Sequence, residues 1–426
     1  VVNLLYNIVD RIYIGHISGI GAAALTGVGL FTPILMLLNA FAMLIGAGGA
    51  PRTAIAMGQG DKEQAEKIIS NSFTMLMIFA VLLTGVFYAS APTLLRLFGA
   101  SDTTLPYALA YSRIYILGSV CVLMVMGMNP FITTQGFAKI SMLTTVIGAV
   151  INIILDPILI FALGLGVQGA AIATVLSQAV GAIWILRFLT GPKTTLKLKK
   201  EYLKPEKKTI LPVVALGISS FVMLSTESLL SISFSSSLAR YGGDVAVGAM
   251  TILSSIMQLQ FMPVQGIAQG AQPIMSFNYG AKKMDRVKRA YHLLFICSFV
   301  YTMVFWLAVE IAPGFFVHLF NSSSQELFEM TKWALRIYMA ATGVFGIQLA
   351  VQQVFMALGQ AKISLFIACL RKIILLIPLI YILPHFFADK VFAVFFAEPV
   401  SDFISVTVAA TLFFLNIKKI LKEGEV

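Results

Sequence analysis

The sequence has 426 residues, of which 58% are hydrophobic and only 12% are charged, with a formal net charge of +11. So much apolar surface cannot be buried in one soluble core, so the composition excludes a soluble globular protein and predicts an integral membrane protein. In a soluble chain the positive charge would favour nucleic-acid binding. In a membrane protein, basic loops reflect topology instead, and no nucleic-acid partner is expected.

Apolar segments of about 20 residues alternate with short polar loops along the whole chain, a length typical of membrane-spanning helices rather than barrel strands. Only about 14 residues precede Gly15, so the first helix is expected to lack its N-terminal half. In chain order, the twelve expected spans are 1–14, 28–50, 70–91, 107–131, 141–163, 167–189, 210–238, 245–278, 292–312, 333–357, 363–383 and 391–415.

Lysine and arginine are distributed unevenly between alternate loops. One set of loops holds most of them, whereas the other set carries only Arg96, Arg240, Lys332 and Lys390. Basic loops stay on the cytoplasmic side of a membrane, so both termini are predicted to be cytoplasmic. Residues 191–209 are expected to form a basic cytoplasmic linker between an N-terminal lobe, 1–190, and a C-terminal lobe, 210–426.

The two lobes share a sequence pattern. Residues 136–141 recur with one exchange as residues 359–364, and residues 113–115 recur unchanged as 336–338, both 223 positions later. Each copy has six expected spans, so both have the same orientation, an arrangement found in secondary transporters. We therefore expect an all-α integral membrane fold, with twelve transmembrane helices in two pseudo-symmetric six-helix lobes around a central cleft.

The sequence lacks the motifs of common enzymes and ATP-binding sites, including HExxH, GxxxxGK[ST] and GxSxG. Its three cysteines, Cys121, Cys297 and Cys369, lie singly in apolar segments, without the spacing of a metal site or a disulfide. We therefore expect no enzymatic activity, no bound metal and no cofactor.

The fifth span carries an amide, a carboxylate and a proline. Asn152 and Asp156 are four residues apart, so on a helix they share one face and can form a hydrogen bond, and Pro157 predicts a kink. A carboxylate at membrane depth costs about 2.5–3.5 kcal/mol and tends to face a wet cavity or a partner. Asp156 is therefore a candidate functional residue. The alternative is a neutral aspartate, bonded to Asn152, that only packs helices together.

Asp10, in the first span, is a second intramembrane acid in the same half. Two carboxylates held close together in a low dielectric cannot both stay ionised, so one of them can bind and release a proton. Pairing with Arg11 is unfavourable, because adjacent helical residues point about 100° apart. Thr174 in the sixth span could add a hydroxyl to this site, although a bond to its own helix is the simpler expectation.

In the second half, Glu227 of the seventh span is expected to be the only acid well inside a helix. The cost of a buried charge predicts that Glu227 faces the cleft, as a contact for a cation or a cationic substrate in this lobe. Basic residues are also present in the spans, namely Arg113, Arg336, Arg371 and Lys372.

Five segments together resemble the multidrug and toxic compound extrusion (MATE) family, near its bacterial multidrug efflux branch. They are Tyr6 to Asp10, Gly48 to Pro51, Asn152 to Pro157, Gly169 to Thr174 and Tyr241 to Asp244, and the resemblance covers the whole chain. It implies a secondary active exporter of cationic amphiphilic compounds that exchanges them for H⁺ or Na⁺ by alternating access.

The resemblance also implies residue roles. An ion-coupling cluster described in some members corresponds to Asp10, Asn152, Asp156 and Thr174. Sodium-coupled relatives instead use an acid in helix 7, to which Glu227 corresponds, and an aspartate in helix 10. The tenth span here, 333–357, has no acid. This departure favours H⁺ over Na⁺ as the coupling ion.

We accordingly expect a multi-pass protein of the bacterial inner membrane, monomeric in membrane lipid, that acts on small cationic or amphiphilic substrates. Two other functions stay open. A flippase or exporter of lipid-linked or polysaccharide substrates from the same superfamily would need a cationic cavity, for which Arg371 and Lys372 are the candidates. An ion channel would conduct far faster than a carrier and would need no alternating cleft.

Overall fold

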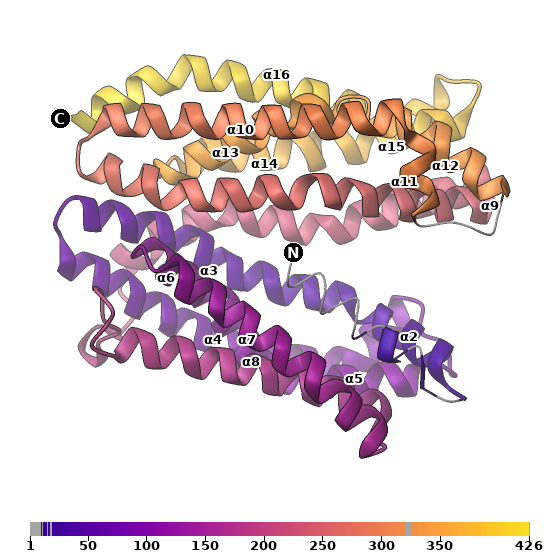
Figure 1. The fold of residues 1–426 in the computed structure, drawn as a ribbon, viewed down its shortest axis with the longest axis horizontal. Helices are drawn as coiled ribbons and strands as arrows, with labels where there is room; N and C mark the ends of the chain where they lie inside the picture. The colour runs from indigo at the N-terminus through magenta and orange to yellow at the C-terminus, as the bar shows by residue number, and fades with distance from the viewer. Residues whose placement is uncertain (1–9, 11, 15, 18, 320–324, 426) are drawn as a thin grey trace. The chain divides into compact units, whose positions relative to one another are not determined.

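The computed structural model describes residues 10, 12–14, 16–17, 19–319 and 325–425 (Figure 1). Throughout these ranges the chain forms helices joined by short loops, and they contain no strand. The predicted all-α class is therefore confirmed. The first expected span, 1–14, lies largely outside the described residues.

Among the residues described, eight helices are long and apolar enough to cross a membrane, and two bent helix pairs raise the number to ten. One of the eight, α9 (Lys207–Gly280), has 74 residues, whereas one crossing needs about 20. Its helical geometry is interrupted at Gly243, with φ 65° and ψ −163°, and the chain turns back there (Figure 1). Positive φ values favour glycine. The expected spans 210–238 and 245–278 are thus the two arms of α9, which makes eleven crossings in the described part of the chain.

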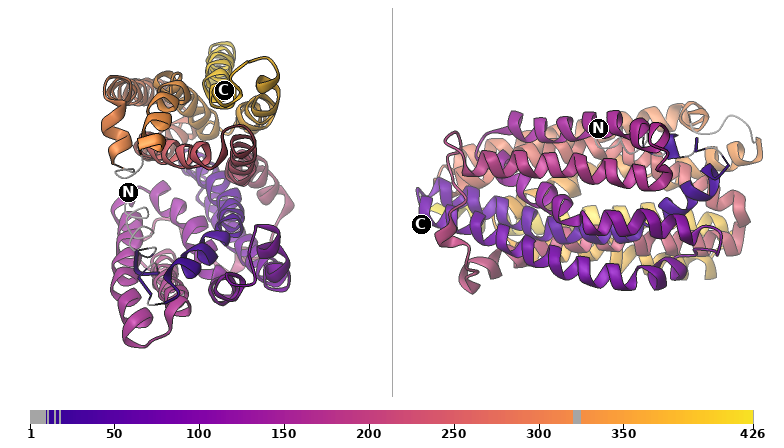
Figure 2. Two further views of the ribbon diagram at one scale, coloured as in Figure 1. Left: turned by 90° about the vertical axis from the view of Figure 1, so that its right-hand side faces the viewer. Right: turned by 90° about the horizontal axis from the view of Figure 1, so that it is seen from below.

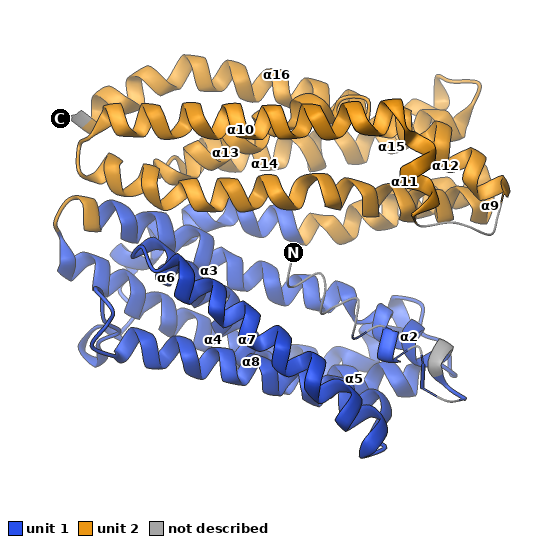
Figure 3. Ribbon diagram, in the orientation of Figure 1, with its two compact units in different colours: residues 1–56, 61–224 blue, residues 57–60, 225–426 orange. Residues whose placement is uncertain are grey.

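The chain divides into two compact units, residues 1–56 with 61–224 and residues 57–60 with 225–426 (Figure 3). The helices of unit 1 are α2 (Gly21–Leu30), α3 (Thr32–Gly58), α4 (Lys62–Leu97), α5 (Leu105–Leu117), α6 (Ser119–Thr134), α7 (Ala138–Pro157), the π-helix η1 (Ile158–Ala162), α8 (Gly166–Thr190), the short η2 (Lys200–Tyr202) and the beginning of α9.

Unit 2 contains the rest of α9 and the helices that follow it. They are α10 (Met284–Ile311), α11 (Pro313–His318), α12 (Gln325–Tyr338), α13 (Thr342–Ala357), α14 (Ala361–Cys369), the π-helix η3 (Leu370–Leu376), α15 (Ile377–Ile382), η4 (Leu383–His385) and α16 (Lys390–Glu425). Viewed along their axes, the helices of each unit lie side by side as a bundle (Figure 2).

The duplication predicted from the sequence reappears in the helix boundaries. Corresponding helices begin 222 or 223 positions apart: α4 and α10 at Lys62 and Met284, α6 and α13 at Ser119 and Thr342, and α7 and α14 at Ala138 and Ala361. The bends correspond as well, since α5 and α6 meet at 55° and α12 and α13 at 51°. The expected spans 107–131 and 333–357 are therefore each a pair of helices joined at a bend, and the bend recurs in both halves.

Small residues allow close helix packing in unit 1. A Cβ atom on Gly48 of α3 would lie 2.0 Å from the carbonyl oxygen of Val213 in α9, so only glycine fits there. At the bend between α5 and α6, a Cβ atom on Gly118 would lie 2.4 Å from a methyl group of Val175 in α8. The glycine therefore lets α8 pack into this bend.

Residues 191–206, which we call the strap, are anchored to unit 1. Asn71 of α4 donates from Nδ2 to the carbonyl oxygen of Tyr202 at 2.8 Å and accepts at Oδ1 from the backbone N–H of Glu206 at 2.7 Å. Lys199 lies 2.6 Å from the buried carboxylate of Glu66, and this hydrogen bond raises the pKa of the Lys199 ammonium. The segment expected to be a linker therefore follows a defined path along α4.

Candidate functional site

Four polar residues predicted from the sequence meet inside unit 1. Asp10, Asn152, Asp156 and Thr174, which we call the Asp156 cluster, are all buried, with exposed fractions of 6%, 0%, 0% and 5%. Asn152 donates from Nδ2 to Asp156 Oδ1 and to Thr174 Oγ1, each at 3.4 Å. The carboxyl groups of Asp10 and Asp156 lie close enough to act on each other electrostatically. Residues of the first, fifth and sixth expected spans thus form one polar site.

The local geometry of α7 and α8 produces this meeting. Helix α7 ends at Pro157, where the sequence predicted a kink, and continues as the π-helix η1. A Cβ atom on Gly169 of α8 would lie only 2.6 Å from the carbonyl oxygen of Leu159 in η1. Glycine therefore lets α8 approach η1 closely, which positions Thr174 beside α7.

The contacts of the Asp156 cluster are suited to holding a proton. Two buried carboxyl groups held close together cannot both stay ionised, so one of them binds a proton. The Thr174 hydroxyl donates to the carbonyl oxygen of Ala170 at 3.1 Å, the expected bond to its own helix, and its contact with the cluster is to Asn152 rather than to a carboxylate. Asn152 Oδ1 is buried and has no hydrogen-bond partner among the residues described.

Unit 2 contains a second buried polar group of residues. Arg371 of η3 lies with Nη2 2.5 Å from Glu398 Oε1 and with Nε 2.6 Å from Asp402 Oδ1, both in α16. The next residue, Lys372, forms an ion pair with Glu227 of α9. These five residues are called the Arg371 cluster below. The expectation that Glu227 is the only acid well inside a helix of this half was wrong, because Glu398 and Asp402 are 2% and 0% exposed.

Glu227 was predicted to contact a cation, and in the structure its carboxylate is paired with the ammonium group of Lys372 in the same unit. Its side chain is 53% exposed, whereas that of Lys372 is only 8% exposed. Arg113 and Arg336 lie at exposed positions, the first over the ring of Tyr88 and the second donating to a backbone carbonyl. The two buried cations of unit 2, Arg371 and Lys372, are thus each paired with acids and do not form a cationic cavity.

A family model, MatE, matches residues 1–158 and 219–382, which is most of the chain. The chain belongs to the MatE family. The multidrug export protein MepA of Staphylococcus haemolyticus (strain JCSC1435) is 24% identical over 412 residues, covering 96% of this chain and 90% of that protein. MepA of Staphylococcus aureus (strain N315) is 24% identical over 385 residues, covering 90% and 84%.

Solved structures agree with the family assignment. The crystal structure of MATE in the bent conformation has a TM-score of 0.93 at 24% identity, covering 100% of this chain and 94% of that chain. The resemblance to the MATE family is therefore confirmed, and with it the twelve-helix membrane fold. MatE proteins are multi-pass membrane transporters, which agrees with the prediction that the chain is not an enzyme.

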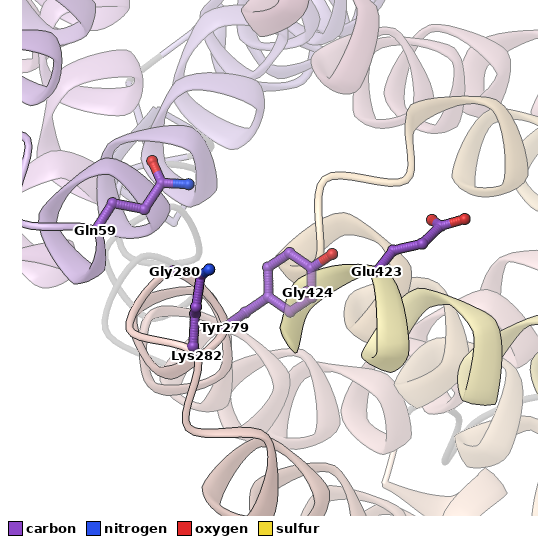
Figure 4. Close-up of a pocket in the computed structure, with 6 residues that line it drawn as sticks. All are labelled: Gln59, Tyr279, Gly280, Lys282, Glu423 and Gly424. Atoms are coloured by element: carbon purple, nitrogen blue, oxygen red, sulfur yellow. The ribbon is translucent and has the colours of Figure 1, made fainter. Parts of the chain in front are cut away.

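One cavity of this MatE protein lies apart from the predicted site residues. It has a volume of about 320 Å³ and lies where α9 and α16 end in unit 2 (Figure 4). Its lining consists of Gln59, Tyr279, Gly280, Lys282, Glu423 and Gly424. No residue of either polar cluster lines it. Over the described ranges, no group of three or more His, Cys, Asp or Glu side chains is arranged to hold a metal ion.

Proposed function

We propose that this MatE protein exports cationic amphiphilic compounds across the bacterial inner membrane in exchange for protons. Multidrug export is supported by the name of its relatives, multidrug export protein MepA. Proton exchange is supported by one observation above all: two acids from distant segments, Asp10 and Asp156, are both buried and close enough to act on each other in an apolar bundle. Na⁺ is the other coupling ion that we consider.

We assign a role to each residue of the Asp156 cluster. Asp10 and Asp156 hold the exchangeable proton, and Asn152 fixes Asp156 by donating to its Oδ1. Thr174 positions Asn152 by accepting from the same amide group. Pro157 and the π-helix η1 weaken the helical ladder next to Asp156, so this segment can change shape when the proton binds.

The proposed cycle is an alternating-access exchange. The outward-facing protein takes up a proton at Asp10 and Asp156, the helices around η1 shift, and the bound substrate leaves. The protein then returns to its inward-facing state, releases the proton to the cytoplasm and binds the next substrate. In this scheme the protein works as a monomer in membrane lipid, with both termini in the cytoplasm.

The exchange ratio decides how much driving force is available. One charge crossing a potential of 100 mV gains about 2.3 kcal/mol, and about 1.4 kcal/mol corresponds to a tenfold concentration ratio. Exchange of one proton for one monovalent cation moves no net charge, so it gains only the pH difference. More than one proton per substrate would add the membrane potential.

In unit 2, we propose that Glu227 contacts the cationic group of the substrate. Its carboxylate now binds Lys372, so a substrate cation would replace the Lys372 ammonium. The side chain of Glu227 is half-exposed, which makes its carboxylate accessible to such a competitor. Because the two buried cations of this unit are matched by acids, no observation favours a polysaccharide or lipid flippase.

Ethidium transport in proteoliposomes tests the proposal. An imposed pH gradient without Na⁺ should drive dye movement by the wild type, and Asp156→Asn should abolish it. Asp285→Asn serves as the matched control, because Asp285 is fully exposed and pairs only loosely with Lys288, at 3.8 Å. Equal dye movement by wild type and Asp156→Asn would contradict the assignment.

A further inference from the structure

The Arg371 cluster contains more acidic than basic groups. The charges that act on Glu398 are those of Arg371, Lys372, Glu227 and Asp402, so ionisation of all five groups leaves one negative charge in excess. From α12, the phenol of Tyr338 also lies within electrostatic reach, but it is uncharged when protonated. From α13, the neighbours are the uncharged Phe345 and Gln348. Lys372 is paired with the half-exposed Glu227, which leaves the buried Arg371 as the only cation bonded to the two buried carboxylates of Glu398 and Asp402 among the residues described. A buried charge without a counter-charge is strongly unfavourable, so this pair of acids lacks one positive charge.

The two acids of α16 have unused hydrogen-bonding capacity. Glu398 and Asp402 each place one carboxylate oxygen on Arg371, at 2.5 and 2.6 Å. Their second oxygens, Glu398 Oε2 and Asp402 Oδ2, are buried and have no hydrogen-bond partner in the part of the chain that the structure describes. Residues four apart on a helix are neighbours on one face, so the two acids can act together.

We propose that Glu398 and Asp402 bind one exchangeable proton, which makes the Arg371 cluster a second proton-binding site of this protein. A proton on either carboxyl group turns an unpartnered oxygen into an O–H donor toward the neighbouring carboxylate. It also brings the summed charge of the five groups to zero. Arg371 has a positioning role, because its guanidinium holds both carboxylates at the same place.

The internal duplication supports this assignment independently. The Asp156 cluster is built from the first, fifth and sixth expected spans, and the Arg371 cluster from the seventh, eleventh and twelfth, which are their counterparts. The fifth span and its counterpart each contain a π-helical segment, η1 and η3. The position 223 residues after Thr174 is residue 397, directly before Glu398. The two clusters therefore occupy corresponding places in the two halves.

This inference goes beyond the proposed function, although it shares the premise that protons drive export. With one exchangeable proton in each unit, two protons could cross for each monovalent substrate cation. That exchange would move one net charge and would make export sensitive to the membrane potential.

The test reads protonation directly rather than transport. Infrared difference spectra of the purified full-length protein, recorded between about pH 5 and about pH 9, follow the C=O stretch of protonated carboxyl groups over a range where ordinary carboxylates stay largely ionised. We expect two components in the wild type. Asp156→Asn should remove one component, and the double variant Glu398→Gln with Asp402→Asn should remove the other. Glu423→Gln, an exposed acid on the same helix, should leave both unchanged.

The outcomes separate this inference from the proposed function. The second proton site is refuted if the double variant still shows both wild-type components. It is also refuted if Na⁺ at constant pH removes the component assigned to Glu398 and Asp402. If the wild type shows the component that the double variant removes but Asp156→Asn removes none, the proposed coupling site fails while the second site stands. If the double variant does not fold, the same spectra are recorded for Glu398→Gln alone. The amide oxygen of the new glutamine can still accept a hydrogen bond from Arg371, so this variant should keep the fold.

Discussion

The anchoring of the strap depends on Asn71, and its replacement by leucine should open the strap. Asn71 is 1% exposed and makes two hydrogen bonds to the strap backbone, at 2.8 and 2.7 Å. Each such bond contributes about 0.5–1.5 kcal/mol, so losing both costs about 2 kcal/mol. Because about 1.4 kcal/mol is a factor of ten, the open population of the strap should rise about 30-fold in Asn71→Leu.

Limited trypsin digestion measures that population. The strap carries exposed lysines, and cleavage tracks the open state when opening and closing are fast relative to the protease. We expect cleavage within residues 191–206 to be about 30-fold faster in Asn71→Leu than in the wild type. Asn416→Leu is the control, because the Asn416 amide donates only within its own helix, to Leu412. An unchanged cleavage rate in Asn71→Leu would refute the view that these side-chain bonds hold the strap.

Three further predictions concern packing and the two clusters. Gly48→Val should prevent monodisperse folding in size-exclusion chromatography, because its Cβ atom would lie 2.0 Å from a carbonyl oxygen of α9, whereas Gly85→Ala, at a position with open space, should fold normally. Lys372→Met frees the Glu227 carboxylate for the substrate cation. Because a charged hydrogen bond contributes about 1.5–3 kcal/mol, the Kd for ethidium, measured by fluorescence, should fall about tenfold. An unchanged Kd would argue against a substrate contact at Glu227. Asn152→Leu removes the hydrogen-bond donor to Asp156 Oδ1. Proton-driven ethidium transport should slow at least about tenfold, while ethidium binding persists. Full transport would contradict the role of Asn152 in orienting Asp156.

Much of the fold was predictable because membrane spans are long and the chain is duplicated. Apolar length located the helices, and the repeats at 136–141 and 359–364 predicted a duplication, within which α7 and α14 begin at Ala138 and Ala361. The bend at Gly118 was not predictable, since it depends on Val175 of a different helix. The strap was missed for a similar reason: its backbone binds side chains of α4, and such contacts leave no periodic pattern in the sequence.

The candidate site was predicted in one half of the chain only. Asn152 and Asp156 stand out because they share a helix face and precede a proline, and the distant Asp10 does meet them. Glu398 and Asp402 show the same spacing of four, but their partner Arg371 lies in a different span. A single sequence does not reveal which acid meets which base across two helices, so this cluster emerged only in three dimensions.

Drug-dependent proton movement in proteoliposomes tests the central claim most directly. The measurement compares wild type with Asp156→Asn, first without Na⁺ and then with it. The account predicts that ethidium drives proton flux without Na⁺ and that Asp156→Asn abolishes this flux. A flux that requires Na⁺, survives in Asp156→Asn and is lost in Glu227→Gln would contradict it and would place the coupling site in unit 2.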